Sequence, residues 1–414
     1  MARGDEPLLS RRTSSDQSDN RLFSDEDDSI YTSKATLPDH PARKRWREII
    51  IFIWALLATA SVLILAVLYE RQISGSGSDT GSSSSPAGKR NLIFMVSDGM
   101  GPSSLSLTRS AWQHMYGLPY SEQLVLDKHL IGQSRTRSTS SLVTDSAAGA
   151  TAFSCGYKSY NGAISVLPDQ SPCGTVLEAA KLAGYKTGLV VTTRLTDATP
   201  ATFASHVRMR DEEDRIAEQL LGDQPLGHMV DLLMGGGRCH FTPQATAGSC
   251  RSDEVDLVTK AEKDGYHYIS DRAGFDGLDS GANVQLPLLG LFADLDISYE
   301  VDRRSENDTY PSLAEMAGTA MRALSDATKD SDKGFFLMIE GSRIDHAGHA
   351  NDPVAQVHEI LSYDAAMASV LEFLDNDDTE GVMISTSDHE TGGLADARRM
   401  SLFFSSLFLL FNIA

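Results

Sequence analysis

The chain is short of positive charge. Its 414 residues include 36 lysines and arginines against 57 aspartates and glutamates, so the formal net charge at pH 7 is −21. Nucleic-acid binding depends on Lys and Arg that neutralise phosphates, so this balance argues strongly against a nucleic-acid partner. On such a chain, a tight site for an anionic substrate needs a local positive centre, for example a bound metal ion.

Cysteine and aromatic residues are also scarce. Aromatic residues make up 7% of the chain and apolar residues 41%, which is the composition of a mainly globular, soluble protein. The four cysteines are Cys155, Cys173, Cys239 and Cys250. An even number in an oxidising compartment fits two local disulfides, 155–173 and 239–250, although four cysteines allow three connectivities. Free thiols are the alternative.

The N-terminal region is poor in apolar residues until one long uncharged run begins at residue 49. Residues 1–48 are rich in Ser, Asp and Arg and predict a disordered cytosolic tail. Residues 49–69 carry no charge, and as a helix they would cover roughly 31 Å, close to the thickness of a bilayer core. A cleaved signal peptide fits poorly, because the run is long and lies far from the N-terminus. The basic run 43–48 (RKRWRE) predicts a type II single-pass protein.

The remainder of the chain is then expected in a lumen or outside the cell. Residues 70–89 are rich in Ser and Gly and predict a flexible stalk. Asn307 begins an Asn-Asp-Thr sequon, where glycosylation is expected on the lumenal side.

Four apolar stretches have the length and composition of buried strands. They begin the segments 91–101, 186–201, 335–349 and 381–393. Helical patterns such as 175–184 and 354–375 lie between them. Strands that alternate with helices predict an α/β fold with a large, mostly parallel central sheet and helices on both faces. We expect one domain over residues 90–397.

Each of these segments also carries residue types that bind metals or phosphate. They are Asp98, Asp197, Thr199, Glu340, Asp345, His349, Asp388 and His389. Ligands of parallel α/β sheets bind beyond the carboxyl ends of the strands. Any one of these residues alone is ordinarily a turn or helix-capping residue. Their convergence at four strand ends favours a common metal site.

Residues 143–156 (VTDSAAGATAFSCG) predict a helix that begins near Ser146. Free N–H groups and the helix dipole stabilise an anion at that place, although a capping role is the ordinary interpretation of such a serine. The small residues that follow allow a phosphate to approach the backbone. A divalent metal that lowers the pKa of the hydroxyl would make Ser146 a nucleophile without a His-Asp pair.

Five ordered motifs resemble those of the alkaline phosphatases. They are VSDGMG, TDSAAGATA, TDATPA, IEGSRIDHAGH and SDHETGG, and the resemblance runs from about residue 90 to about 397. The tail, apolar run and stalk resemble the membrane-anchored vacuolar (repressible) form of fungi. The resemblance implies a phosphomonoesterase of broad specificity with a phosphoserine intermediate, two Zn²⁺ and one Mg²⁺ ion per chain, and usually a homodimer.

The resemblance also implies a role for each site residue. Ser146 would be the nucleophile, and Arg210 in HVRMR (206–210) would hold the phosphate with two hydrogen bonds, with Arg208 as the nearby alternative. The metal residues would be Asp345 and His349 on the first zinc, Asp388 and His389 on the second, Asp98 between the second zinc and magnesium, and Thr199 and Glu340 on magnesium. Asp197 would act on magnesium through water, and His346 would point elsewhere.

The sequence departs from the family after His389. The family supplies one more histidine to the first zinc from a later segment, and this chain has no histidine beyond His389. Residues 398–414 end in an uncharged apolar run that we interpret as aberrant, from splicing or gene prediction or from a short isoform. The alternative function is therefore a catalytically impaired chain that binds metal or phosphate without efficient turnover, because catalytic zinc normally has three protein ligands.

Other members of the superfamily are rival interpretations. A sulfatase would carry a modifiable Cys or Ser in a C/S-x-P-x-R setting, and Ser146 is followed by Ala-Ala-Gly. Diesterases often use threonine and lack the magnesium residues Thr199 and Glu340. These features favour monoesters as substrates.

Overall fold

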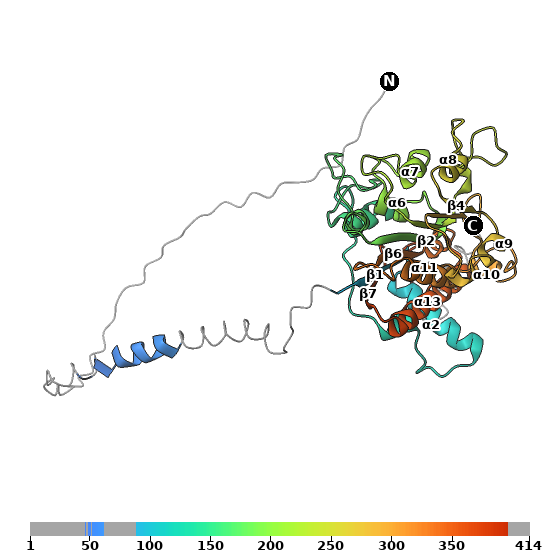
Figure 1. Cartoon of the computed structure of the whole chain (residues 1–414). Coiled ribbons are helices and arrows are strands. Elements are labelled where there is room, and N and C mark those ends of the chain that lie inside the picture. The colour runs from blue at the N-terminus through green and yellow to red at the C-terminus, as the bar shows by residue number, and fades with distance from the viewer. Residues whose placement is uncertain (1–45, 47–48, 51, 62–87, 396–414) are drawn as a thin grey trace, which may run out of the picture. The chain divides into compact units, whose positions relative to one another are not determined.

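The computed structural model describes residues 46, 49–50, 52–61 and 88–395, and the chain divides into two compact units, Met1–Ser84 and Ser85–Ala414 (Figure 1). The described residues of the first unit are helical. Within the described parts of the chain, no helix is both long and apolar enough to cross a membrane. The predicted membrane segment 49–69 extends beyond those parts. Nearly all of the predicted tail, most of the stalk and the whole of 398–414 also lie outside them.

The second unit is built on one parallel sheet of seven strands, in the order β4-β5-β3-β2-β6-β1-β7. The strands are β1 (Arg90–Ser97), β2 (Lys186–Arg194), β3 (Leu232–Gly236), β4 (His267–Ile269), β5 (Leu288–Leu291), β6 (Phe335–Gly341) and β7 (Glu380–Thr386). The four strands predicted from the sequence are β2, β6, β1 and β7, which are neighbours in the sheet. The short strands β3, β4 and β5 were not predicted.

Helices cover both faces of this sheet, as predicted for an α/β fold. They are α2 (Pro102–Tyr116), α3 (Val125–Lys128), α4 (Ser146–Cys155), α5 (Val176–Leu182), α6 (Ala198–Ala204), α7 (Glu213–Leu220), α8 (Leu257–Lys263), α9 (Arg272–Asp276), α10 (Glu300–Arg303), α11 (Leu313–Ala327), α12 (Arg343–His349) and α13 (Pro353–Asn376), with short 3-10 turns at Arg238–His240 and Asp279–Gly281. Figure 1 shows α6 and α7 on one side of the strands and α11 and α13 on the other.

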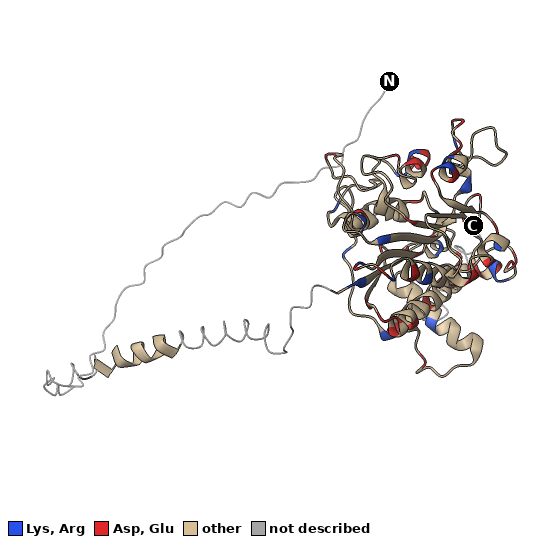
Figure 2. Ribbon diagram, viewed as in Figure 1, with Lys and Arg blue, Asp and Glu red and all other residues tan. Residues whose placement is uncertain are grey.

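The central strand β6 shows why residues 335–339 form an uninterrupted apolar run. All seven of its residues are buried. Leu337 and Ile339 pack into one hydrophobic cluster with residues of α11 and α13. Phe336 and Met338 pack into a second cluster with residues of α5, α6 and α7 on the opposite face. Successive side chains of a strand point to opposite faces, so a strand covered on both sides loses the apolar–polar alternation. Charged residues of both signs lie mainly on the surrounding helices and loops (Figure 2).

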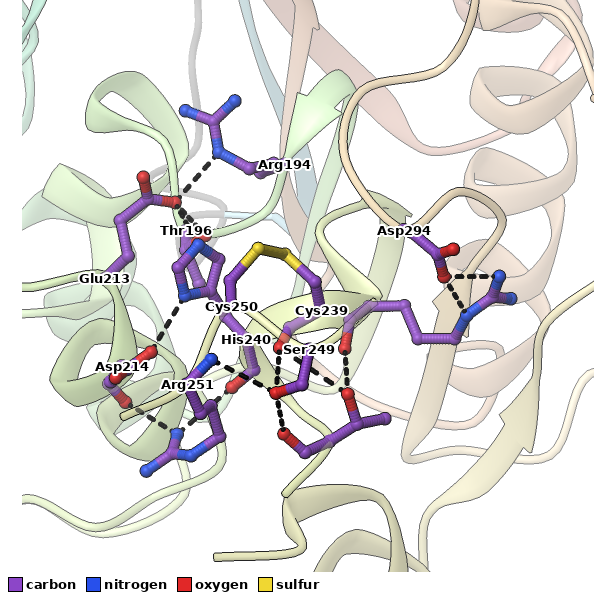
Figure 3. The surroundings of a disulfide bond; sticks show 12 residues. Arg194, Thr196, Glu213, Asp214, Cys239, His240, Ser249, Cys250, Arg251 and Asp294 are labelled. Atoms are coloured by element: carbon purple, nitrogen blue, oxygen red, sulfur yellow. Dashed lines mark hydrogen bonds and ion pairs between the residues drawn. A yellow bond between two sulfur atoms is a disulfide. The ribbon is translucent and has the colours of Figure 1, made fainter. Parts of the chain in front are cut away.

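Both disulfides predicted from local spacing form. They join Cys155 to Cys173, 18 residues apart, and Cys239 to Cys250, 11 residues apart. The second bridge closes a loop that follows β3, and it lies beside His240 and Arg251 (Figure 3).

Candidate metal and phosphate site

The carboxyl ends of three adjacent strands bring the predicted acidic residues together. Asp98 follows β1, Glu340 is the penultimate residue of β6, and Asp388 comes two residues after β7. The register places Val96 of β1 opposite both Glu340 of β6 and Thr386 of β7. The three carboxyl groups thus enter one region because the strands that carry them are neighbours in the sheet.

Ser146 lies beside a group of metal-binding residues. Ligand atoms of Asp98, Asp388 and His389 all lie within 4.8 Å of one another. Ser146 Oγ lies 3.4 Å from Asp98 Oδ1 and 3.2 Å from His389 Nε2. Ser146 is the first residue of α4, which Asp145 caps by accepting a hydrogen bond from the Ala148 N–H at 2.9 Å. The predicted nucleophile and two of the predicted ligands of the second zinc therefore share one site.

Burial makes the charged forms of these carboxyls costly. Asp98, Glu340 and Asp388 are 6%, 1% and 1% exposed. Desolvation, followed by repulsion from Asp388 and Asp345, raises the pKa of Asp98 well above its ordinary value. Desolvation raises the pKa of Asp388 to about 7, and desolvation followed by the charge of Asp98 raises the pKa of Glu340. Buried carboxylates are normally paired or bound to a metal.

One orphaned atom shows that the residues fit a cation. Asp388 Oδ2 is buried and accepts no hydrogen bond from the described residues; it lies 3.2 Å from His389 Nε2, while Asp388 Oδ1 accepts a hydrogen bond from the Gly99 N–H at 3.1 Å. A buried carboxylate oxygen without a donor is costly, and coordination to a metal ion would satisfy it. Carboxylate and imidazole together suit zinc.

The pair predicted for the first zinc lies on helix α12. Asp345 is buried, and its Oδ2 lies 3.5 Å from His349 Nε2, so the two share one face as their spacing requires. Thr391 connects this pair to the other one. Its hydroxyl lies 2.5 Å from Asp345 Oδ1 and 3.0 Å from His389 Nδ1.

The residues predicted for magnesium surround the other side of Asp98. Thr199 Oγ1 donates to Asp98 Oδ2 at 3.2 Å, so Asp98 lies between Thr199 and Ser146. Glu340 accepts a hydrogen bond from the Ser342 hydroxyl at 2.7 Å. Hard oxygen ligands of this kind suit magnesium.

Arg210 interacts with two acidic residues of the recognised motifs, Asp145 and Asp197. Its Nη2 donates to Asp197 Oδ1 at 2.9 Å, and its Nη1 lies 3.6 Å from Asp145 Oδ2. Arg208 is exposed, and its backbone carbonyl accepts a hydrogen bond from Tyr160. Asp145 directly precedes Ser146 in the chain, so these contacts favour Arg210 over the exposed Arg208 as the arginine of this site.

His346 lies next to two acidic residues, Asp296 and Asp197. Its Nδ1 lies 3.4 Å from Asp296 Oδ2, and its Nε2 lies 3.8 Å from Asp197 Oδ2. His346 is therefore a neighbour of the predicted site residue Asp197, whose other carboxylate oxygen accepts a hydrogen bond from Arg210.

Comparison with known proteins decides the family. The family model described as "Alkaline phosphatase" matches residues 89–408. The chain belongs to the alkaline phosphatase family. Repressible alkaline phosphatase of Saccharomyces cerevisiae is 60% identical over 324 residues, which cover 76% of this chain and 57% of the yeast protein. Alkaline phosphatase of Schizosaccharomyces pombe is 49% identical over 371 residues, which cover 88% and 66%. The resemblance inferred from the five motifs is confirmed, including the likeness to a fungal form.

The fold also matches solved alkaline phosphatases. A TAB5 alkaline phosphatase mutant with magnesium bound in its M3 site shares 32% identity and a TM-score of 0.60, over 74% of this chain and 79% of that one. The chain spans less than two thirds of the length of the two fungal alkaline phosphatases. Neither the family match nor these relatives support the alternative of a catalytically impaired chain.

Sequence reasoning missed several residues that contact the predicted site residues. They are Asp145, Arg194, Asp296, Ser342 and Thr391. Asp145 and Thr391 lie inside the recognised motifs TDSAAGATA and SDHETGG, so their polar side chains were available as a signal. Arg194 Nη1 donates a hydrogen bond to Asp296 Oδ1 at 2.9 Å, although the two residues are 102 positions apart in the sequence. No local sequence pattern indicates a contact over such a separation.

Proposed function

We propose that the chain hydrolyses phosphate monoesters in a metal-dependent reaction through a phosphoserine on Ser146. The observation that carries the proposal is the position of Ser146 Oγ, 3.4 Å from Asp98 and 3.2 Å from His389, beside the orphaned Asp388 oxygen. A hydroxyl at a helix N-terminus next to metal-binding side chains suits attack on a bound phosphate.

The metal ligands are assigned as the family resemblance implies. Zinc would be held by Asp345 with His349 and by Asp388 with His389, and magnesium by Thr199 and Glu340, with Asp98 shared and Asp197 acting through water. When bound, these cations supply Lewis-acid stabilisation of the entering and leaving oxygens. Support comes from the buried carboxyls with raised pKa values and from the orphaned oxygen.

The chain's own residues account for the remaining steps. Arg210 donates two N–H groups to phosphate oxygens and orients the phosphorus toward Ser146. The serine oxygen forms a bond to phosphorus while the ester P–O bond breaks, and the alcohol leaves with a proton. Water then cleaves the Ser146–phosphorus bond, returns a proton to the serine and releases inorganic phosphate. The N-terminal end of α4 stabilises negative charge at this point.

The test uses the full chain loaded with zinc and magnesium. We expect turnover of p-nitrophenyl phosphate, loss of turnover after chelation, and a labelled phosphoserine after acid quench with radiolabelled substrate. Ser146→Ala should abolish both the label and turnover, while Ser154→Ala, in the same helix, should keep them. Metal-loaded wild type without turnover and without label would refute the proposal.

We further propose that this enzyme is anchored as a type II membrane protein and faces the vacuolar lumen as a homodimer. Support comes from the uncharged residues 49–69 behind the basic run 43–48, and from exposed Asn307 in its sequon. Alkaline extraction of membranes, protease protection and endoglycosidase treatment of wild type against Asn307→Gln test the anchor, orientation and glycan. Light scattering of the purified protein tests the dimer.

A further inference from the structure

Arg194 joins three carboxylates behind the phosphate site. It ends strand β2, and its side chain is 19% exposed. Its Nη2 lies 3.1 Å from Asp197 Oδ2, its Nη1 lies 2.9 Å from Asp296 Oδ1, and its Nε lies 2.9 Å from Glu213 Oε2. The planar guanidinium thus holds three acidic groups from separate segments in fixed positions.

Glu213 is itself held from the side of the second disulfide. Its Oε2 lies 2.6 Å from the Thr196 hydroxyl and 3.2 Å from His240 Nε2, while His240 Nδ1 lies 2.8 Å from Asp214 Oδ1. Figure 3 shows Glu213 between Arg194 and His240, with the Cys239–Cys250 bridge beside the histidine. The disulfide-closed loop therefore supports the carboxylate that orients Arg194.

Asp197 divides its two oxygens between two arginines. Oδ2 faces Arg194, while Oδ1 accepts from Arg210 Nη2 at 2.9 Å and from the Ala198 N–H at 2.7 Å. Arginine and a carboxylate left to themselves favour a two-bond, parallel arrangement. Because Oδ2 is occupied, Arg210 binds Asp197 through Nη2 alone, and its Nη1 donates no hydrogen bond to any described residue, with Asp145 Oδ2 at 3.6 Å.

We propose that Arg194 is a positioning residue for phosphate binding: by occupying Asp197 Oδ2 it prevents a two-bond Asp197–Arg210 pair and keeps Arg210 available for the substrate. The inference rests on the proposed function in taking Arg210 as the phosphate-binding residue. Arg194 itself does not touch the phosphate.

Loss of Arg194 changes the balance of charge around Asp197. The basic groups that remain near Asp197, Glu213 and Asp296 would then include His346, His240, Arg210 and Arg343. His346 Nε2 is 3.8 Å from Asp197, farther than Arg210 Nη2. Asp197 would therefore turn both oxygens to Arg210, and the bound anion would have to compete with it.

The experiment compares Arg194→Met and Arg194→Lys with wild type, in the metal-loaded full chain. We expect Arg194→Met to raise KM and the inhibition constant of inorganic phosphate about three- to thirty-fold, with a smaller change in kcat. Arg194→Lys should recover part of the phosphate affinity. A lysine ammonium can form an ion pair with Asp197, but it lacks the planar guanidinium that binds three carboxylates at once. Calorimetric titration with inorganic phosphate gives a readout without turnover.

A second substitution tests the route through Asp197. In the Asp197→Asn background, Arg194→Met should have little further effect on phosphate affinity, because the competing carboxylate is gone. The matched control is Arg303→Met, since Arg303 is 6% exposed and its guanidinium binds Glu300, Asn307 and the Tyr310 carbonyl. It should lower stability and leave phosphate affinity unchanged.

The outcomes separate this inference from the proposed function. Wild type without phosphate affinity or turnover would overturn the proposed function, and the inference with it. Wild type with normal affinity, and Arg194→Met with the same affinity and only a lowered melting temperature like Arg303→Met, would overturn the inference alone. An equal loss of affinity from Arg194→Met in the wild-type and Asp197→Asn backgrounds would also overturn it.

Discussion

A buried ion pair holds the segment that carries Arg210. His206 Nε2 lies 2.7 Å from Glu178 Oε1, and His206 Nδ1 lies 2.9 Å from the Ser165 carbonyl oxygen. A carboxylate and a carbonyl only accept, so both ring nitrogens donate and the imidazole is protonated. Burial, the largest influence, lowers the pKa of His206, but the hydrogen bonds to Glu178 and Ser165 outweigh it and raise the pKa above 6.5.

The size of the effect follows from the burial of the partner. In His206→Ala the Glu178 side chain, 2% exposed, loses its cation. Breaking one half of a buried pair costs about 3–5 kcal/mol. Glu178 Oε2 keeps its hydrogen bond from the Thr175 N–H at 2.9 Å, so we expect the lower end, about 3 kcal/mol.

The destabilisation by His206→Ala should depend on pH. Because folding raises the pKa of His206, its stabilising contribution is complete below the unfolded pKa of about 6.5 and is lost as pH rises through the folded pKa. The difference in free energy of unfolding between wild type and His206→Ala should therefore be largest near pH 6 and shrink toward alkaline pH.

Urea unfolding of the full chain, followed by circular dichroism, measures this difference across the pH range. The exposed His129 provides the control, since His129→Ala should change stability little at any pH. A difference for His206→Ala that stays constant from pH 6 to pH 10, or grows with pH, would refute the ion-pair reasoning.

Three further predictions concern the metal site and the core. Thr391→Val should weaken zinc binding about 10–100-fold in competition with a chelator, because Thr391 orients Asp345 and His389; unchanged affinity would contradict this. The free energy of unfolding of the chelator-stripped chain should fall as pH rises from about 4 to about 7, since folding raises the pKa of Asp388 to about 7. Metal loading should remove this fall, and an equal fall in the metal-loaded chain would count against the metal site. Gly341→Ala should lower the free energy of unfolding by about 1–3 kcal/mol in a denaturant titration, because the added Cβ would lie 2.7 Å from the fully buried Tyr363. The control is Gly318→Ala, whose Cβ would meet no atom within 4 Å and should not destabilise the chain. Equal effects of the two substitutions would be inconsistent with this packing.

Short sequence patterns were sufficient to predict features whose cause lies within a few residues or a short loop. The uninterrupted apolar run that became β6 predicts a strand buried on both faces, because only a covered strand dispenses with polar residues. The i, i+4 spacing of Asp345 and His349 predicts one helix face, and both lie on α12. The two disulfides join cysteines close in sequence, for which short loop closure favours pairing.

The strands β3, β4 and β5 could not be predicted from local sequence patterns. β3 (LLMGG) and β5 (LLGL) are short and contain glycine, and β4 has only three residues. Such segments carry little strand signal, since glycine and short length both weaken it. They become strands through backbone pairing with distant segments: β3 pairs with β2, β5 pairs with β3, and β4 pairs with β5.

The amino-acid sequence alone determined which residues could serve as ligands, nucleophile and phosphate-binding group, because their chemical types stand in short motifs at strand ends. Only the tertiary structure decided that they meet. The strand order places Asp98, Glu340 and Asp388 at the carboxyl ends of neighbouring strands, and folding brings Asp197, Glu213 and Asp296 around the guanidinium of Arg194. The physical reason is that charge pairing and desolvation depend on distances of a few ångström between groups that lie far apart along the chain.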